Sequence, residues 1–178
     1  MTTTLPNDGL LKTARILTTI FMVLTAFGAA ALTVAIPVAL LSQSHVAAAM
    51  LPDANSSLGG VLGALMIVLL CGAAIMALAF TFFRLLRQII NSVGERDPFV
   101  VENADRLWRM GWIAVAVELM KLPAGAMAIF LESQFESDKM HFDFDFSIAG
   151  LLIALILFIL ARVFRHGAAM REDLEGTV

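Results

Sequence analysis

Glu118 and Lys121 are the residues whose types and spacing best suit chemistry, because both carry charge inside a long apolar run. Three residues apart on a helix, they share a face, and glutamate before lysine is the favourable order for an ion pair. Gly111, Glu118 and Gly125 recur every seven residues, so this face can approach another helix closely. The pair is either a self-neutralised structural element, which we favour, or a proton or ligand site within the membrane.

A second group of polar residues alternates with phenylalanine in residues 141–146. This period of two predicts a short extended segment. Its polar side chains would share one face and could bind a divalent cation: His141, Asp143 and Asp145. Three ligands on a loop are a weak signal, so we expect a solvated acidic edge and no metal.

Nucleophiles and cofactor motifs give no further signal. Cys71 is the one cysteine and lies deep in an apolar run, so we expect a small core residue rather than a reactive thiol. The sequence has no nucleophile elbow, phosphate loop, HExxH or CxxC pairing. We therefore expect a protein that is not an enzyme and that carries no cofactor.

The elements that position these residues are transmembrane helices. Hydrophobic residues make up 60% of the chain and charged residues 15%, and the mean hydropathy is +0.87. Soluble domains are roughly 45–50% apolar and about 25% charged. Four runs reach the roughly 20 residues that span a bilayer, at approximately 16–41, 58–86, 112–131 and 146–164. The first run is too long for the apolar part of a signal peptide.

Lysine and arginine predict how these spans are oriented, because they concentrate on the cytoplasmic side. Of the 12 such residues, Lys121 lies inside a span and Lys139 follows the third span. The rest flank the other ends of the spans: Lys12, Arg15, Arg84, Arg87, Arg96, Arg106, Arg109, Arg162, Arg165 and Arg171. We therefore expect both termini, a loop at 87–111 and a tail at 165–178 in the cytoplasm.

This pattern predicts an all-α membrane protein. The expected architecture is a four-transmembrane-helix bundle that forms one domain over residues 1–178, with a short extended segment in its second external loop. The arginines should also meet anionic lipid headgroups. Gly59 and Gly63 form a small-residue pattern that predicts close helix packing, more within the monomer than in a dimer. The oligomeric state is left open.

The loop at 87–111 is expected to hold two helix ends joined by a turn. Gly94 and Pro98 both disfavour helix, so the break should fall between Gly94 and Phe99. A helix should resume near Glu102 and Asn103, where an acidic group suits the positive end of the helix dipole.

Two stretches on the expected cytoplasmic side resemble a bacterial membrane family catalogued as domain of unknown function 2975. Residues 97–107 read DPFVVENADRL, similar to the family's DPFxxENAxRL element. Residues 163–178 read VFRHGAAMREDLEGTV, similar to a family ending of the form FRxG…REDxELTV. Here Gly176 replaces the usual leucine and Val101 stands where proline is common. The resemblance implies a small multi-pass protein of the bacterial plasma membrane, whose relatives are often encoded beside a small helix-turn-helix regulator.

The leading functional hypothesis is a regulatory or signalling protein that holds such a cytoplasmic regulator and binds no nucleic acid itself. Its partner surface would combine the turn and the tail: Asp97, Pro98, Phe99, Glu102, Asn103, Arg106, Arg165, Gly167 and Asp173. Phe99 would be its apolar centre. In a simpler alternative, the tail docks on the loop and only closes the bundle. The second hypothesis is a small transporter or channel component that uses Glu118 and Lys121.

Overall fold

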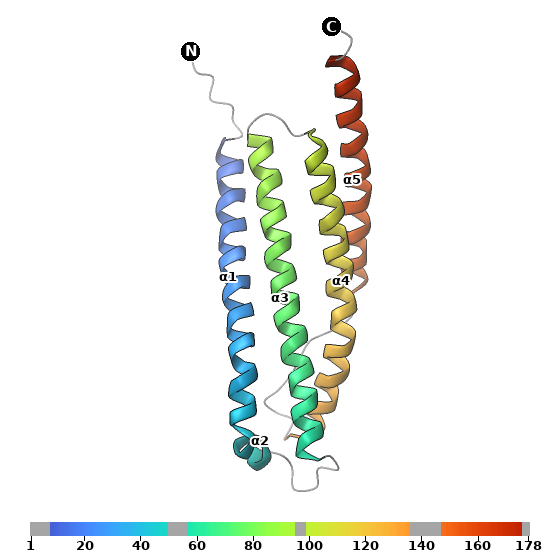
Figure 1. Ribbon diagram of the computed structural model, residues 1–178. Helices are drawn as coiled ribbons and strands as arrows, with labels where there is room; N and C mark the ends of the chain where they lie inside the picture. Colours follow the sequence, from blue (N-terminus) through green and yellow to red (C-terminus); the bar gives the residue numbers. More distant parts are fainter. Residues whose placement is uncertain (1–7, 50–56, 95–98, 136–146, 176–178) are drawn as a thin grey trace. The chain divides into compact units, whose positions relative to one another are not determined.

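The computed structural model describes residues 8–49, 57–94, 99–135 and 147–175, and all their regular structure is helical (Figure 1). The helices are α1 (Asp8–Leu41), α2 (Gln43–Ala49), α3 (Leu58–Gly94), α4 (Val101–Glu132) and α5 (Ile148–Glu175). Four of them, all except the short α2, are long and apolar enough to cross a membrane. The predicted all-helical chain with four such helices is therefore confirmed for the described residues.

The long helices extend past the predicted spans. α3 runs to Gly94 and α4 starts at Val101, so most of the expected loop at 87–111 is helix, as its residues indicated. α5 continues to Glu175, so the tail from 165 onward is mainly helical. The predicted extended segment at 141–146 lies outside the described residues.

Exposed apolar side chains cover the long helices, and the most apolar window of α1 has no buried residue. The threonine hydroxyls of α1 donate to carbonyls four residues earlier, as Thr19 does to Arg15 at 2.7 Å and Thr33 to Ala29 at 2.7 Å. Backbone and hydroxyl donors are thus satisfied within the helix, which a lipid environment requires. These features fit a multi-pass membrane protein.

The contacts of the chain fall into two compact units. Unit 1 comprises Met1–Thr25, Leu78–Val115 and Ile148–Val178, and unit 2 comprises Ala26–Ala77 and Ala116–Ser147. Unit 1 therefore holds α5 with one part of α1, α3 and α4. Unit 2 holds α2 with the other parts of those three helices.

The core of unit 1 joins α3, α4 and α5. Its buried side chains are Leu85, Ile89, Leu107, Met110, Leu157 and Ala161. Small Ala161 lets α5 approach closely, and the larger residues fill the space at three- and four-residue spacing. α1 packs on α3 through Phe21 and Phe83, whose rings stack with centroids 5.0 Å apart.

The core of unit 2 is formed by Val61, Ala64 and Val68 of α3 with Leu131 of α4. α1 and α3 approach closely at glycines: a Cβ on Gly28 would lie 3.2 Å from the Met76 sulfur. Close helix packing within the monomer is not seen at Gly63 among the described residues, because a Cβ there would meet nothing within 4 Å of them. The dimer alternative at Gly59 and Gly63 stays a prediction.

Candidate functional site

Asn103 joins the end of α3 to the start of α4. Its Nδ2 donates to the Ser92 hydroxyl at 2.7 Å, and that hydroxyl donates to the Ile89 carbonyl at 2.8 Å. Its Oδ1 accepts from Arg106 at 2.6 Å. The side chain is fully buried, at 0% exposed. Asn103 therefore belongs to the interior of unit 1, and Arg106 turns inward to it; neither matches the expected position on an open surface.

Phe99 packs against α5 just before α4 begins. Its ring lies 5.4 Å from that of Phe164, centroid to centroid. A Cβ on Gly167 would lie 3.0 Å from the Phe99 ring, so a glycine is what lets the ring lie this close. The turn and the tail thus meet, and Phe99 keeps 46% of its surface exposed.

An ion pair lies beside this contact. Arg165 donates to the Asp105 carboxylate at 3.0 Å, and both side chains are exposed. Exposed pairs of this kind contribute about 0–1 kcal/mol, so this pair adds orientation more than stability.

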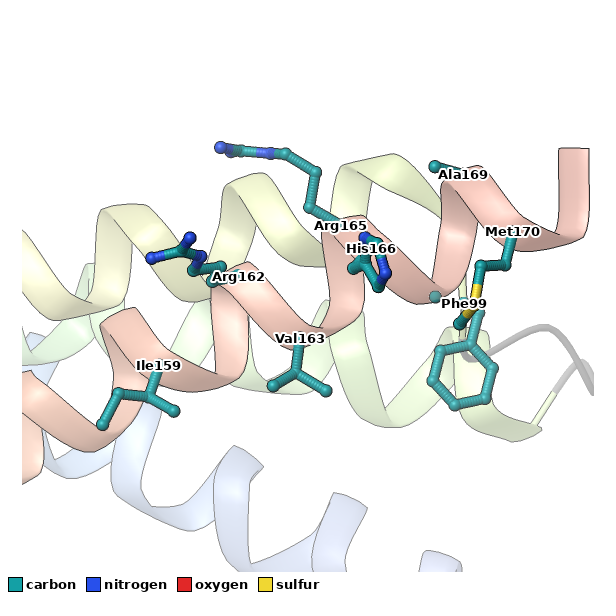
Figure 2. A pocket seen from close by; sticks show the side chains of 9 residues that line it. Phe99, Ile159, Arg162, Val163, Arg165, His166, Ala169 and Met170 are labelled. Carbon is teal, nitrogen blue, oxygen red and sulfur yellow. The ribbon is translucent and has the colours of Figure 1, made fainter. Parts of the chain in front are cut away.

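A groove of about 990 Å³ opens where Phe99 meets α5. We call it the Phe99 groove; it is lined by Phe99, Ile159, Arg162, Val163, Arg165, His166, Gly167, Ala169 and Met170. Figure 2 shows Ile159, Val163, Met170 and Phe99 on one side of α5, with Arg162 and Arg165 projecting from the other. The groove therefore has an apolar side and a cationic side.

The structure brings together three of the predicted surface residues, Phe99, Arg165 and Gly167. Glu102 is exposed nearby on α4. Asp97, Pro98 and the side chain of Asp173 lie outside the described residues. Sequence reasoning missed Ile159, Val163 and Met170, although their spacing of four and seven residues along one helix was a usable signal.

Glu118 and Lys121 form the predicted pair in unit 2. Lys121 Nζ lies 2.8 Å from Glu118 Oε1, and Glu118 is only 4% exposed. The backbone N–H of Ser147 donates to the other carboxylate oxygen at 3.0 Å. Both oxygens are thus engaged by the chain itself, which supports the structural interpretation over a proton or ligand site.

The Ser147 contact also shows where the chain returns to α4. Ser147 immediately precedes α5, whereas Glu118 lies 14 residues before the end of α4 at Glu132. At about 1.5 Å per residue this is roughly 21 Å along the helix. The Glu118 carboxylate therefore accepts a hydrogen bond from the backbone N–H of Ser147, which lies outside any helix, at a point well inside the length of α4.

The metal candidates His141, Asp143 and Asp145 lie outside the described residues. Within the described ranges, no group of three His, Cys, Asp or Glu side chains is placed to hold a metal ion. Cys71 is a free, half-buried thiol on α3.

Residues 45–178 match the model of a family described as "Protein of unknown function (DUF2975)". The chain belongs to this family. No curated protein and no solved structure matches it.

The DUF2975 match covers α3, α4 and α5 and leaves out α1. The Phe99 groove and the Glu118–Lys121 pair both lie within it. The DUF2975 description names no chemistry.

Proposed function

We propose that this DUF2975 protein is a non-enzymatic regulatory or signalling protein of the plasma membrane that holds a cytoplasmic protein in the Phe99 groove. A small helix-turn-helix regulator is the candidate partner. The observation that carries the proposal is an exposed apolar groove along α5 that is lined by Phe99, Val163 and Met170 and bordered by Arg162 and Arg165.

The position of the groove supports this proposal. Arg162 of α5 and Arg109 of α4 suit the headgroup region. Phe99, Gly167 and Met170 lie further toward the same helix ends, with Met170 about 12 Å beyond Arg162 along α5. Lipid tails do not cover apolar side chains at that level, and an exposed apolar patch rimmed by charge is typical of a protein-binding site.

The shape and charge of the groove suit an amphipathic helix. An apolar stripe of the partner would lie on Val163, Phe99 and Met170, as in helix-in-groove recognition. Acidic residues along its edge would face Arg165. This fits a regulator that presents a short helix outside its DNA-reading surface.

The transporter alternative has less support. Glu118 and Lys121 are matched with each other, and the remaining carboxylate oxygen accepts from Ser147. An ion or proton pathway needs a carboxylate that exchanges partners with water or substrate.

The test is binding of the purified candidate regulator to the full-length protein in nanodiscs. Phe99→Ala and Met170→Ala should each weaken binding at least about tenfold, because both truncate the apolar side of the groove. Val101→Ala is the matched control, since Val101 is 50% exposed on α4 and does not line the groove. If Phe99→Ala lowers thermal stability while binding is unchanged, the groove only closes the helix ends and the proposal fails.

A further inference from the structure

A second pocket lies beside the Phe99 groove in unit 1. It has a volume of about 500 Å³ and is lined by Trp108, Phe158, Ile159, Arg162 and Arg165. We call it the Trp108 pocket. Its size falls within the roughly 300–1,000 Å³ of small-molecule sites.

The apolar part of the Trp108 pocket is an aromatic cluster. Trp108 and Phe158 meet edge to face with centroids 4.8 Å apart, and Trp112 packs on Phe158 at 5.6 Å. Gly111 permits this, because a Cβ there would lie 2.7 Å from the Phe158 ring. Both tryptophans remain exposed. Exposed tryptophan on a membrane-length helix is typical of the lipid headgroup boundary.

The charged part of the pocket has excess positive charge. Arg165 is paired with Asp105, but neither Arg162 nor Arg109 has an acidic partner among the residues that the structure describes. Arg109 lies four residues after Asp105 and so shares its face of α4. The two arginines that line the pocket, Arg162 and Arg165, thus face one described carboxylate, that of Asp105, and the lining has a net positive charge.

An apolar path leads from the pocket along α5. Leu155 lies seven residues before Arg162 and is exposed on the same face of the helix. Moving toward Leu155, the surface changes from arginine through tryptophan and phenylalanine to aliphatic side chains. This is the polarity profile of a phospholipid, from phosphate to acyl chain.

We infer that the Trp108 pocket binds one anionic phospholipid. Its phosphate binds Arg162 of the pocket lining, because guanidinium binds phosphate in two parallel hydrogen bonds. Its glycerol region rests on Trp108 and Phe158, and an acyl chain follows Leu155. The excess positive charge selects a lipid with net negative charge over a zwitterionic one.

Tryptophan fluorescence tests this directly, because Trp108 and Trp112 are the two tryptophans of the chain. Trp112→Phe leaves Trp108 as the single emitter. The Trp112→Phe protein is reconstituted in phosphatidylcholine that contains increasing amounts of brominated phosphatidylglycerol. In a second series it is reconstituted in phosphatidylglycerol that contains increasing amounts of brominated phosphatidylcholine. Quenching should show preferential binding of phosphatidylglycerol, and Arg162→Gln should lower that preference about fivefold.

Arg87→Gln is the matched control, since Arg87 is an exposed arginine of α3 in the same unit. It should leave the preference unchanged. Arg162→Lys keeps the charge and should retain part of the preference, which separates a lost site from a misfolded protein. Equal quenching by both brominated lipids would overturn the inference. An equal loss of the preference for phosphatidylglycerol in Arg162→Gln and Arg87→Gln would overturn it as well.

Discussion

Lys121 is the residue whose removal should reveal how Glu118 is stabilised. Lys121→Ala leaves the buried carboxylate with only the Ser147 amide, and stranding a buried charged group costs about 1–3 kcal/mol or more. The double change Glu118→Gln with Lys121→Ala removes the charge as well and should be less destabilising. Thermal unfolding in detergent compares the two. Equal stabilities would indicate a water-exposed carboxylate and would revive the transporter hypothesis.

The change in the free energy of unfolding caused by Gly167→Ala should depend on whether Phe99 is present. Replacing glycine by alanine inside a helix raises the free energy of unfolding by about 0.5–1 kcal/mol. With Phe99 present, the new methyl would lie 3.0 Å from the ring and displace it, which offsets the gain. In a Phe99→Ala background the full gain should appear. A double-mutant cycle by chemical unfolding measures the difference, and an identical effect in both backgrounds would contradict the observed contact.

At the scale of elements, the joint between α3 and α4 rests on Asn103. Asn103→Ala leaves Ser92 and Arg106 without their partner in a buried site, at a cost of about 1–3 kcal/mol in the free energy of unfolding. The natural control is Glu102→Ala on the neighbouring exposed position, which should change stability by under about 0.5 kcal/mol. Unfolding monitored by circular dichroism would show both effects, and similar losses for the two variants would rule out a special role for Asn103.

The elements were more predictable than their contacts. Gly94 and Pro98 marked the break between α3 and α4, because local backbone preference determines where a helix stops. Hydropathy placed the end of the fourth span at 164, but α5 runs to Glu175 since Ala168, Ala169 and Met170 favour helix without being part of a span. The burial of Asn103 depends on Ser92, eleven residues earlier, and no local pattern reports such pairing. The spacing of Glu118 and Lys121, by contrast, predicted their ion pair because it is local to one helix.

At the scale of the whole molecule, charge predicts how the chain lies in the membrane. Two contacts in unit 1 bring helix ends together: Arg15 of α1 lies against Gly94 of α3, and Phe99 at the start of α4 lies against Gly167 of α5. The start of α1 therefore lies by the end of α3, and the start of α4 by the last part of α5 (Figure 1). With ten basic residues expected on one side, reporter fusions at Val178 should be cytoplasmic and those at Asn55 external. A cytoplasmic signal at Asn55 would overturn this topology.

The bond between Ser147 and Glu118 has a consequence for the order of events during synthesis. Ser147 is made after all of α4, so its amide is absent when Glu118 first enters the lipid. Lys121 is only three residues away on the same helix and is already present. Because a lone charge at a helix centre costs about 2.5–3.5 kcal/mol on insertion scales, this local pairing lowers the barrier for α4 on its own. Lys121 would thus shield the carboxylate from the start, and Ser147 would join it as the second partner that the folded chain shows on the other oxygen.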